Sequence, residues 1–418
     1  MEDNESGISS IPSFYDRPGV KLEKLPIGPG VLIGIEQAYN PEIGIGGAYG
    51  TWGDSYDNKD LSQVIAKHLG EPLSAEEAMD LTELGFVRRH IIPQLTSQED
   101  IDLEIQVGAR FLRQAAAACG WEPAEVQAVL VGVGGPVLDD YTEQIAKEAG
   151  IPDSAVKVSI HKACDGSVAG LNLALNAALP VNRFLDRNLA EELYGKKVLV
   201  GGIDGLSRFL KFSHDKNALQ LFGNGAGVIG VIPGQTMKLL TSRTYEAFDE
   251  EGVLQVKMCY PYTGEHTVEQ SRIEVSQVSR NHYRVAGLMH TPEGAEPMVM
   301  AGLMGMVKLF VRSGVQVIKE VYQDYQVRMT ERGMPGKDFA VAIVHHANLK
   351  INRLLEKHLQ REGIFISMPW LLSEFGNVSA ASNMIAFLRQ LPKLKSGDHI
   401  LIDGFGAGTY YDVLAVEV

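Results

Sequence analysis

The segment "VKVSIHKACDGSVAGLNLALNAAL", residues 156–179, joins a short apolar run to a longer apolar stretch with helical spacing. It predicts a strand that ends at about residue 160, followed by a helix in which Gly166, Ala169 and Gly170 permit close packing. Cys164 stands at the junction, where the first N–H groups of the helix and its dipole favour a thiolate. A free cysteine is otherwise most often a buried filler. The position favours a nucleophile.

The same alternation of strands and helices extends in both directions from this junction. Before it lies "VQAVLVGVGG" (126–135), and after it come "KKVLVGGID" (196–204) and "GAGVIGVIP" (225–233). A second series follows a long helical pattern at about 297–330: "FAVAIVHHA" (339–347), "IFISM" (364–368), "HILIDGFG" (399–406) and "YYDVLAVEV" (410–418), with helices between the first three. Such alternation predicts mostly parallel sheets that are covered by helices on both faces.

The remaining segments give weaker signals. Residues 1 to about 27 read as a loose tail, which is followed by a strand "GVLIGIEQAY" (30–39). Residues 40–58, rich in Gly, Asp and aromatics, predict a loop, and residues 235–295 are polar and irregular. Helical spacing recurs at about 60–84 and 99–119.

Composition excludes several classes of protein. The 418-residue chain has a net charge of −14, which disfavours nucleic acid or an anionic membrane as its main partner. No apolar run is long enough for a membrane span, and the acidic, polar start is unlike a signal peptide. Three cysteines without a CxxC pair predict neither a disulfide framework nor a cysteine zinc site, and a reducing cytoplasm fits. Cys119 and Cys259 do not begin a helix and read as fillers.

Two other strand ends carry residues that are capable of chemistry. "AIVHHAN" (342–348) supplies His345 and His346, and "SEFGNVSAAS" (373–382) supplies Asn377 on a Gly-Asn turn. Taken alone, each has a structural reading: a histidine at a strand end is most often a packed residue, and Gly-Asn is a common turn pair. Zinc would need further ligands at short spacing, and none are near. Ligands of α/β sheets nevertheless gather at the carboxyl ends of strands, where these residues lie.

Taken together, these motifs resemble those of the 3-oxoacyl-acyl-carrier-protein synthase III family, a group of thiolase-fold condensing enzymes. The resemblance rests on "ACDG" at Cys164, "HHANLKI" at His345 and "GNVSAAS" at Asn377, in that order. It is supported by "ELGFVRRHI" (83–91), "LFGNGAGVIG" (221–230), "MAGLMGMVKLFV" (300–311) and the C-terminal "SGDHILIDGFGAGTYYDVLAVEV" (396–418).

The resemblance implies a thiolase fold with two similar βαβαβαββ halves in five layers, αβαβα. The corresponding regions are a tail at 1–27, an N-terminal half at 28–234, an irregular insertion at 235–295 and a C-terminal half at 296–418. It also implies a homodimer in which "VKVSI" pairs across the two-fold axis.

The chemistry that it implies is a decarboxylative Claisen condensation in fatty acid or polyketide biosynthesis, with no cofactor and no metal. Cys164 would take the acyl group from a thioester, and the backbone N–H groups of Cys164 and Ala407 would hold the oxyanion. His345 and Asn377 would stabilise the enolate of a malonyl or β-ketoacyl thioester. Alternatives are an acyltransferase to an alcohol or amine, a synthase of dialkylresorcinols or cyclohexanediones, and a non-catalytic partner subunit on the same fold.

The sequence departs from the family at several positions. The Trp and Arg that hold the adenine of coenzyme A fall on Met79 and Glu83, which favours acyl-carrier protein over acyl-CoA as the substrate. Asp139 and Asp140 occupy the place where a glutamate reaches across the dimer in head-to-head condensing enzymes, or they cap a helix. Lys162 either supports a thiolate or lines a sheet edge.

Overall fold

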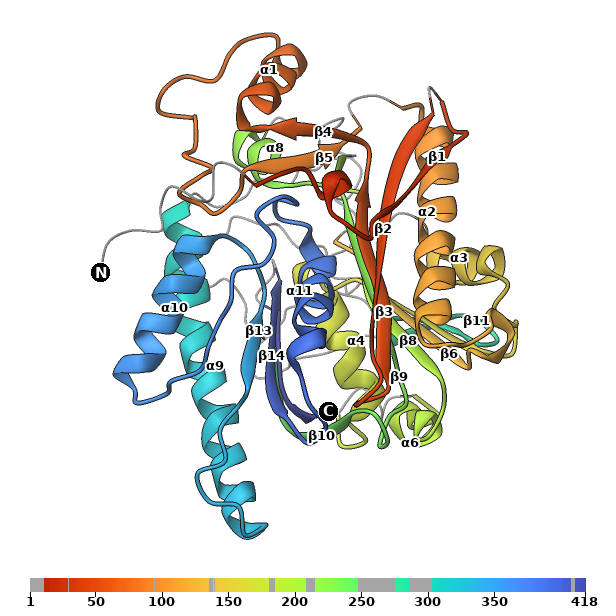
Figure 1. Cartoon of the computed structure of the whole chain (residues 1–418), viewed down its shortest axis with the longest axis vertical. Helices are drawn as coiled ribbons and strands as arrows, with labels where there is room; N and C mark the ends of the chain where they lie inside the picture. The colour runs from red at the N-terminus through yellow and green to blue at the C-terminus, as the bar shows by residue number, and fades with distance from the viewer. Residues whose placement is uncertain are drawn as a thin grey trace, which may run out of the picture.

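Two mixed β-sheets enclose a pair of buried helices in the computed structural model of the chain (Figure 1). The structure describes residues 11–28, 30–92, 95–134, 138, 140–179, 185–207, 215–246, 275–285, 303–406 and 410–418. Helices α4 (Gly166–Leu175) and α11 (Ser382–Gln390) form the central layer. Helices α2 (Ser97–Ala118) and α3 (Tyr141–Ala149) cover one outer face, and α9 (Leu303–Glu331) with α10 (Leu349–Arg361) covers the other. The predicted αβαβα layering is confirmed.

The larger sheet has nine described strands in the order β1-β2-β3-β9-β8-β6-β7-β12-β11. Their bounds are β1 Lys21–Leu25, β2 Val31–Asn40, β3 Ile45–Trp52, β9 Gly225–Val231, β8 Val198–Asp204, β6 Ala128–Gly132, β7 Val156–Ile160, β12 His282–Val285 and β11 Val275–Ser279. β6 pairs in parallel with both β7 and β8, so the carboxyl ends of these three strands meet at one edge of the sheet. Cys164 follows β7 at that edge.

The smaller sheet has the order β10-β15-β14-β13, with β10 Lys238–Glu246, β15 Tyr410–Glu417, β14 His399–Gly406 and β13 Val341–Val344. Strands β4 (Asp54–Asp57) and β5 (Arg88–Ile91) form a separate pair. Short helices α1 (Asn58–Leu69), α6 (Leu189–Leu193) and α8 (Lys216–Leu221) complete the described elements, apart from single 3-10 turns.

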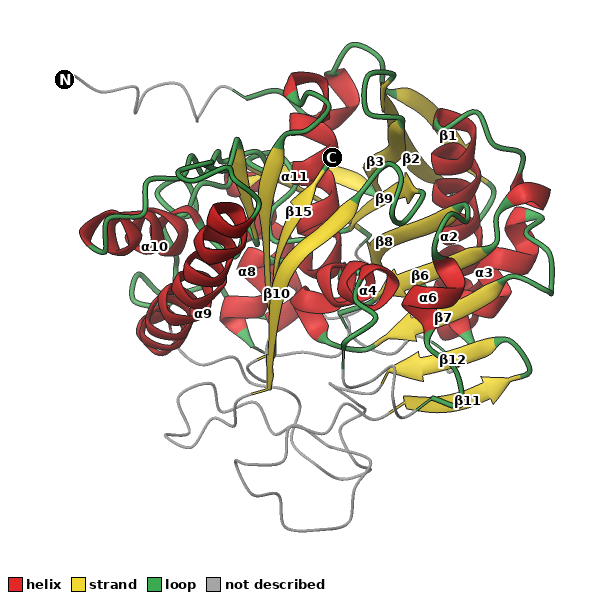
Figure 2. Ribbon diagram, turned by 90° about the horizontal axis from the view of Figure 1, so that it is seen from below, coloured by secondary structure: helices red, strands yellow, loops and turns green. Residues whose placement is uncertain are grey.

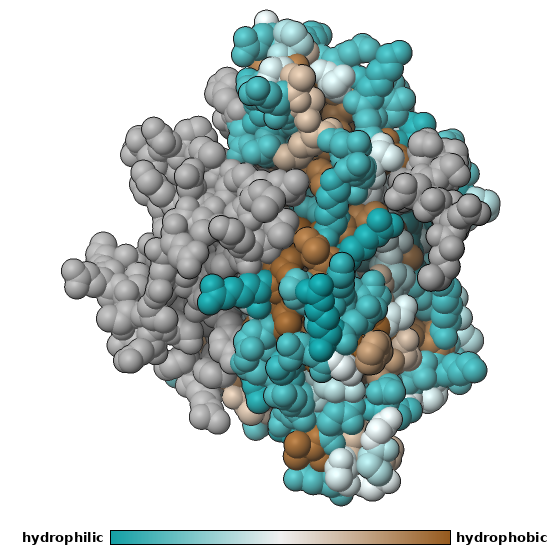
Figure 3. All heavy atoms as spheres, turned by 90° about the vertical axis from the view of Figure 1, so that its left-hand side faces the viewer, coloured by the Kyte–Doolittle hydropathy of each residue, from teal (hydrophilic) through white to brown (hydrophobic). Residues whose placement is uncertain are grey.

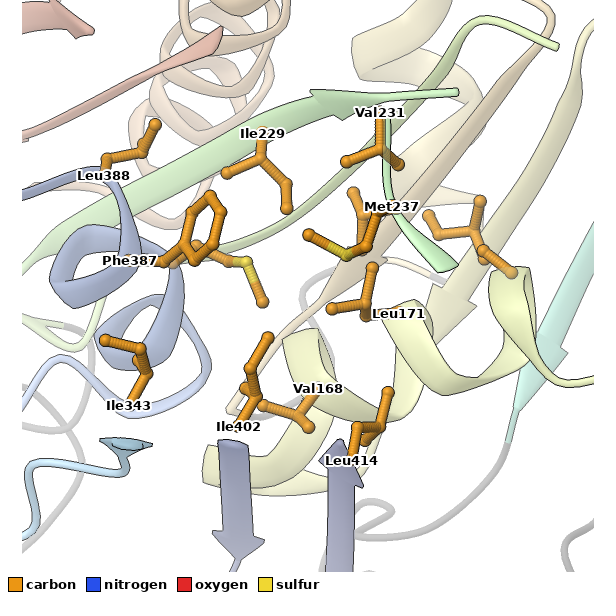
Figure 4. Packing of buried hydrophobic residues seen from close by; sticks show 14 of the residues in the cluster. Val168, Leu171, Ile229, Val231, Met237, Ile343, Phe387, Leu388, Ile402 and Leu414 are labelled. Atoms are coloured by element: carbon orange, nitrogen blue, oxygen red, sulfur yellow. The ribbon is translucent and has the colours of Figure 1, made fainter. Parts of the chain in front are cut away.

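The main core lies between the two sheets, around α4 and α11. Figure 4 shows Val168 and Leu171 of α4 and Phe387 of α11 facing side chains from strands of both sheets, among them Ile229, Ile402 and Leu414. Residues 166–174 of α4 are all buried, because apolar residues lie on every side of this helix and its two polar side chains, Ser167 and Asn172, are enclosed with them. The first residues of α4 and α11 are therefore fixed by dense packing.

Residues 40–58 are not the predicted loop. They contain β3, whose eight residues are all buried, and β4. The glycines that suggested a loop lie where neighbouring backbones approach closely: a Cβ at Gly47 would overlap the Val228 carbonyl oxygen, and one at Gly50 would overlap that of Gly34. Here glycine supplies room in a buried strand.

Other predicted boundaries also differ. Part of the predicted tail forms β1 at the sheet edge, and helix α1 ends at Leu69 well before residue 84. Residues 235–295 include β10, which pairs with β15, and the hairpin β11–β12, which joins the larger sheet. The segment "IFISM" does not form the predicted strand. Its Ser367 carbonyl accepts one backbone hydrogen bond from Ala342 N–H of β13, and its Phe365 side chain is 74% exposed.

The face that carries α9 and α10 is largely hydrophilic where Figure 3 colours it, with scattered apolar side chains. Among the residues that the structure describes, no helix has both the length and the apolar character needed to cross a bilayer.

Candidate active site

Cys164 lies on a tight turn between β7 and α4. The turn is the 3-10 segment Ala163–Asp165, and Ala163 has a φ of 48°, which is uncommon for a residue with a side chain. Between Ala155 and Ala174 every residue is buried except Cys164, which keeps partial exposure. The strained turn thus brings one thiol out of a buried strand and helix. This separates Cys164 from a packing cysteine.

The electrostatics of the thiol differ from the sequence-based expectation. Burial raises the pKa of Cys164 to about 12; a hydrogen bond from Ser379 opposes this shift, and the nearby carboxylates of Asp204 and Asp165 add to it. The resting group is therefore a thiol, and the helix N-terminus alone does not make it a thiolate. A reaction at Cys164 needs a proton acceptor.

The C-terminal half contains a second turn of the same shape. Ser379 has a φ of 47°, next to 48° for Ala163, and it begins the 3-10 segment Ser379–Ala381 before α11. The residues that precede the two turns, Val378 and Lys162, also share their backbone angles (φ −108°, ψ 29° and φ −107°, ψ 33°). The two turns pack against each other. Ala380 corresponds to Cys164, so the two halves repeat in backbone and only one carries a thiol.

Asp204 fastens the two turns to the larger sheet. It ends β8 and is fully buried, and its carboxylate accepts hydrogen bonds from Gly134 N–H after β6 and from Ala380 N–H at 2.8 Å. A Cβ at Gly202 would overlap the Ala380 carbonyl, so the strand and the turn are in backbone contact. Sequence reasoning missed Asp204, although it stands at the end of a predicted strand as His345 does.

Asn377 is held by both backbone and side chain. Its N–H donates to Leu221 O at 2.9 Å, and its carbonyl accepts from Gly223 N–H at 3.1 Å. Its Oδ1 accepts from Ser379 N–H at 2.9 Å. This bond fixes the orientation of the amide, and Nδ2 then makes no hydrogen bond within the described part of the chain. Asn377 therefore stabilises the turn through Oδ1, and its Nδ2 group can donate to a ligand.

His345 directly follows β13, and its N–H donates to Asp403 O of β14 at 2.9 Å. Its ring contacts Phe405 edge-on at 5.3 Å between centroids. Burial, with His346 as a neighbour, lowers the pKa of His345 to about 3, so the ring is neutral at pH 7. Nδ1 is enclosed without a hydrogen-bond partner among the described residues, which leaves Nε2 as the nitrogen for a ligand.

His346 has a structural part. Its Nδ1–H donates to Val344 O at 2.8 Å, and Nε2 accepts from Leu371 N–H at 3.1 Å. The ring packs on Trp370. Burial lowers the pKa of His346 to about 4, and both ring nitrogens are used. It is therefore a packed residue and not a second catalytic histidine.

Strand β14 brings the pieces together. The His345 backbone N–H bonds to Asp403 of this strand, and the His345 ring contacts Phe405. The strand ends at Gly406, so close to the Cys164 turn that a Cβ on Gly406 would be 3.2 Å from Cys164 N. The predicted second oxyanion donor, Ala407, is the next residue and lies outside the described residues, as do Cys259 and Asp139. Cys119 caps α2, and burial raises the pKa of its thiol to about 11.

Lys162 neither faces solvent nor serves as a free charge beside the thiol. Its ammonium lies 3.2 Å from the Asp412 carboxylate of β15, with 2% and 1% of the two side chains exposed. Asp412 also accepts hydrogen bonds from Asn172 at 2.6 Å and Thr244 at 2.7 Å. Asp165, on the other side of Cys164, is buried too, and burial followed by the Asp412 charge raises its pKa well above the usual value. Asp412 thus holds the turn through Lys162, and its charge acts on Asp165 at the other side of Cys164.

The remaining candidates lie at the periphery. Asp140 precedes α3; its side chain makes no cap hydrogen bond to the helix backbone and accepts one from the Gln144 side chain at 2.8 Å. Met79 lines a cavity of about 640 Å³ between α1 and residues 72–82, whose lining includes no Lys or Arg. Glu83 pairs with Lys350 at the surface. Within the described residues no group of three His, Cys, Asp or Glu side chains is arranged to hold a metal ion.

Comparisons with known proteins bear on this geometry. Residues 329–418 match the family described as "3-Oxoacyl-[acyl-carrier-protein (ACP)] synthase III C terminal". The chain is 25% identical over 363 residues to a β-ketoacyl-[acyl-carrier-protein] synthase III of Clostridium tetani, covering 85% of this chain and 91% of that protein.

Two solved structures share the fold. The 3-oxoacyl-[acyl-carrier-protein] synthase III of Aquifex aeolicus aligns with a TM-score of 0.59 at 20% identity, covering 96% of this chain and all of that one. The priming β-ketosynthase of the R1128 polyketide pathway aligns with a TM-score of 0.59 at 22% identity, covering 92% and 97%. The predicted thiolase fold is confirmed.

Proposed function

Because the chain is a divergent member of the 3-oxoacyl-[acyl-carrier-protein] synthase III-like enzymes, we propose that it forms a carbon–carbon bond between two thioesters, with Cys164 as the acyl carrier. The observation that carries the assignment of Cys164 is its exposure: between Ala155 and Ala174, which span the strand, the turn and nearly all of the helix, it is the one residue that is not buried. A thiol on a strained turn at the carboxyl edge of the sheet is placed for attack on a bound carbonyl.

The first step is acyl transfer. The sulfur of Cys164 bonds to the carbonyl carbon of an acyl thioester, and the bond to the carrier sulfur breaks, so the carrier leaves as a thiol. Since the pKa of Cys164 is about 12, its proton must pass to a base as the bond forms. We assign this proton to the departing carrier sulfur, which leaves as a thiol. Burial lowers the pKa of His345 to about 3, so its ring is too weak a base to keep the proton and stays neutral.

The second step is decarboxylative condensation. A malonyl thioester loses its carboxylate as carbon dioxide, the electron pair moves to an enolate, and the enolate carbon attacks the acyl-Cys164 carbonyl. A β-ketoacyl thioester has no carboxylate to lose and would form the same kind of enolate by giving up an α-proton to a base. The new bond forms as the Cys164 sulfur leaves. The enolate oxygen needs neutral donors; Asn377 Nδ2 is unused, and a neutral His345 can supply Nε2–H. This pairing favours condensation over transfer to an alcohol or amine.

The thioester carrier that we propose is acyl-carrier protein. The cavity at Met79 has no cation in its lining, and Glu83 presents a carboxylate that is already paired with Lys350. Neither feature suits the phosphates of coenzyme A, whereas a carrier protein needs only its pantetheine arm to enter.

Intact-protein mass spectrometry tests the nucleophile. We expect Cys164→Ala to abolish the mass increase after incubation with acyl-carrier proteins and acyl-CoAs, because the other described thiol, Cys119, lies at the C-terminal end of α2 and not at the carboxyl edge of the sheet. Cys119→Ala is the matched control and should acylate as the wild type does, since its thiol packs against Gly230. Undiminished acylation of the Cys164 variant would overturn the assignment.

A further inference from the structure

The outer edge of β7, the strand that leads to Cys164, is already occupied. β12 pairs with it in parallel through four residue pairs, from His282↔Lys157 to Val285↔Ile160. Lys157 N–H donates to Asn281 O at 2.8 Å and His161 N–H to Val285 O at 2.9 Å. Figure 2 shows β12 and then β11 continuing the sheet beyond β7. These backbone donors are therefore not available to another chain.

β12 is a packed strand of this sheet. His282, Tyr283 and Val285 are buried, and the last two belong to the same core cluster as β7. The His282 ring lies 2.8 Å from Ser159 Oγ through Nε2, and Arg187 donates to the Tyr283 hydroxyl at 3.2 Å. Side chains thus fix the register that the backbone pairs define.

The turn of the hairpin is fastened to the elements around β7. Ser279 Oγ donates to Glu143 of α3 at 3.0 Å. Asn281 Nδ2 donates to Asp153 O, in the loop that leads into β7, at 3.0 Å. Because α3 and this loop flank β7 on its own chain, the anchors hold the hairpin locally.

β11 has the features of a protected sheet edge. It has five residues, "VSQVS", and its pairing with β12 is interrupted by a register shift between Gln277 and Ser279. Gln277 is exposed. Short, bulged and polar edge strands resist pairing with a further strand.

We propose that the β11–β12 hairpin takes the place at β7 that a second copy of the chain would take, so that each chain closes its own larger sheet and supports the Cys164 turn without a partner's strand. The homodimer expected from the sequence, with "VKVSI" paired across a two-fold axis, then does not form at this edge. The inference stands on strand pairing and is independent of the thioester chemistry.

Amide hydrogen exchange of the full chain, followed by mass spectrometry or NMR, tests the proposal beside sedimentation at nanomolar to micromolar concentration. We expect slow exchange at Lys157 and His161 that does not change when the protein is diluted. If the protein dimerises and the amides of Lys157 and His161 stay protected after the dimer dissociates, the proposal is supported, because the strand that covers them then belongs to the same chain. Protection that is lost as dimers dissociate would overturn it.

A pair of variants sharpens the test. Val285→Asp places a carboxylate in the core beside His161 and should raise exchange at Lys157 and His161 by roughly tenfold or more, since local opening sets the rate. Gln277→Ala, on the exposed edge strand, should leave both rates unchanged. Unchanged exchange in a folded Val285→Asp protein would show that β12 does not cover β7.

Discussion

At the scale of residues, the amide of Asn377 combines two tasks that are usually separate. Its Oδ1 closes the turn by accepting Ser379 N–H, which leaves Nδ2 as the donor for a ligand. The neighbouring Ser379 also reaches the Cys164 thiol. A turn residue and a catalytic donor are thus the same side chain, and two variants can separate these tasks.

We expect Asn377→Asp to slow condensation by roughly 10²–10³-fold while single-turnover acylation of Cys164 stays near the wild-type rate, because one enolate donor is lost. Asp keeps an oxygen for Ser379 N–H and so preserves the turn. Asn377→Ala removes both the donor and the acceptor and should lose condensation together with some thermal stability.

Rates of acylation and of overall product formation, measured side by side, distinguish a catalytic role of Asn377 from a purely structural one. If Asn377→Asp condenses normally and only Asn377→Ala is impaired, Asn377 is structural and the condensing mechanism loses its enolate donor.

At the scale of elements, the catalytic turn depends on strands from the far end of the chain. Lys162 and Asp165 flank Cys164, and Asp412 of β15 interacts with both. A buried ion pair adds little compared with apolar packing, but removing one partner leaves an uncompensated charge in the core. The turn and the last strand are therefore coupled through charge.

Lys162→Met should destabilise the protein by about 3–5 kcal/mol, since the Asp412 carboxylate is left buried without its cation. The double variant Lys162→Met with Asp412→Leu should recover much of that loss. Lys350→Met is the matched control, because its pair with Glu83 is 47% and 59% exposed and should contribute little. Denaturant unfolding measures all three, and equal effects of Lys162→Met and Lys350→Met would refute the coupling.

At the scale of the whole molecule, stability depends on a buried carboxyl group. Asp403 is fully buried, its carboxylate oxygens have no partner among the described residues, and burial raises its pKa to about 8. In the unfolded chain this group ionises near its ordinary value of 3.8. Between these values the folded state holds a proton that the unfolded state has lost, so stability falls as pH rises from about 4 to about 8.

Asp403→Asn removes this dependence and keeps the shape of the protonated acid. Its gain in melting temperature over the wild type should grow from about pH 5 to about pH 8 and stay level above that. Asp186→Asn, at an exposed position, is the control and should show no such trend. A gain that is constant with pH would mean that Asp403 is ionised in the folded protein.

Local patterns in the sequence were enough to predict the alternation of strands and helices and the positions of Cys164, His345 and Asn377 at the ends of elements, and the family resemblance implied the five layers. Such features depend on periodicity and on where a strand stops, which neighbouring residues determine. The catalytic parts assigned to these residues remain predictions for the experiments above.

Other features depended on contacts between distant segments. The glycines of β3 indicated a loop in the sequence, but in the fold they lie against the backbones of Val228 and Gly34, where there is no room for side chains. Asp204 gains its importance only when β8 meets the turn at Ala380, 176 residues away. The hairpin β11–β12 lies in a segment with no regular pattern, and only its pairing with β7 makes it part of the sheet. The pKa of Cys164 rises and does not fall, because desolvation and two carboxylates outweigh the end of a helix, and tertiary packing alone brings those groups together.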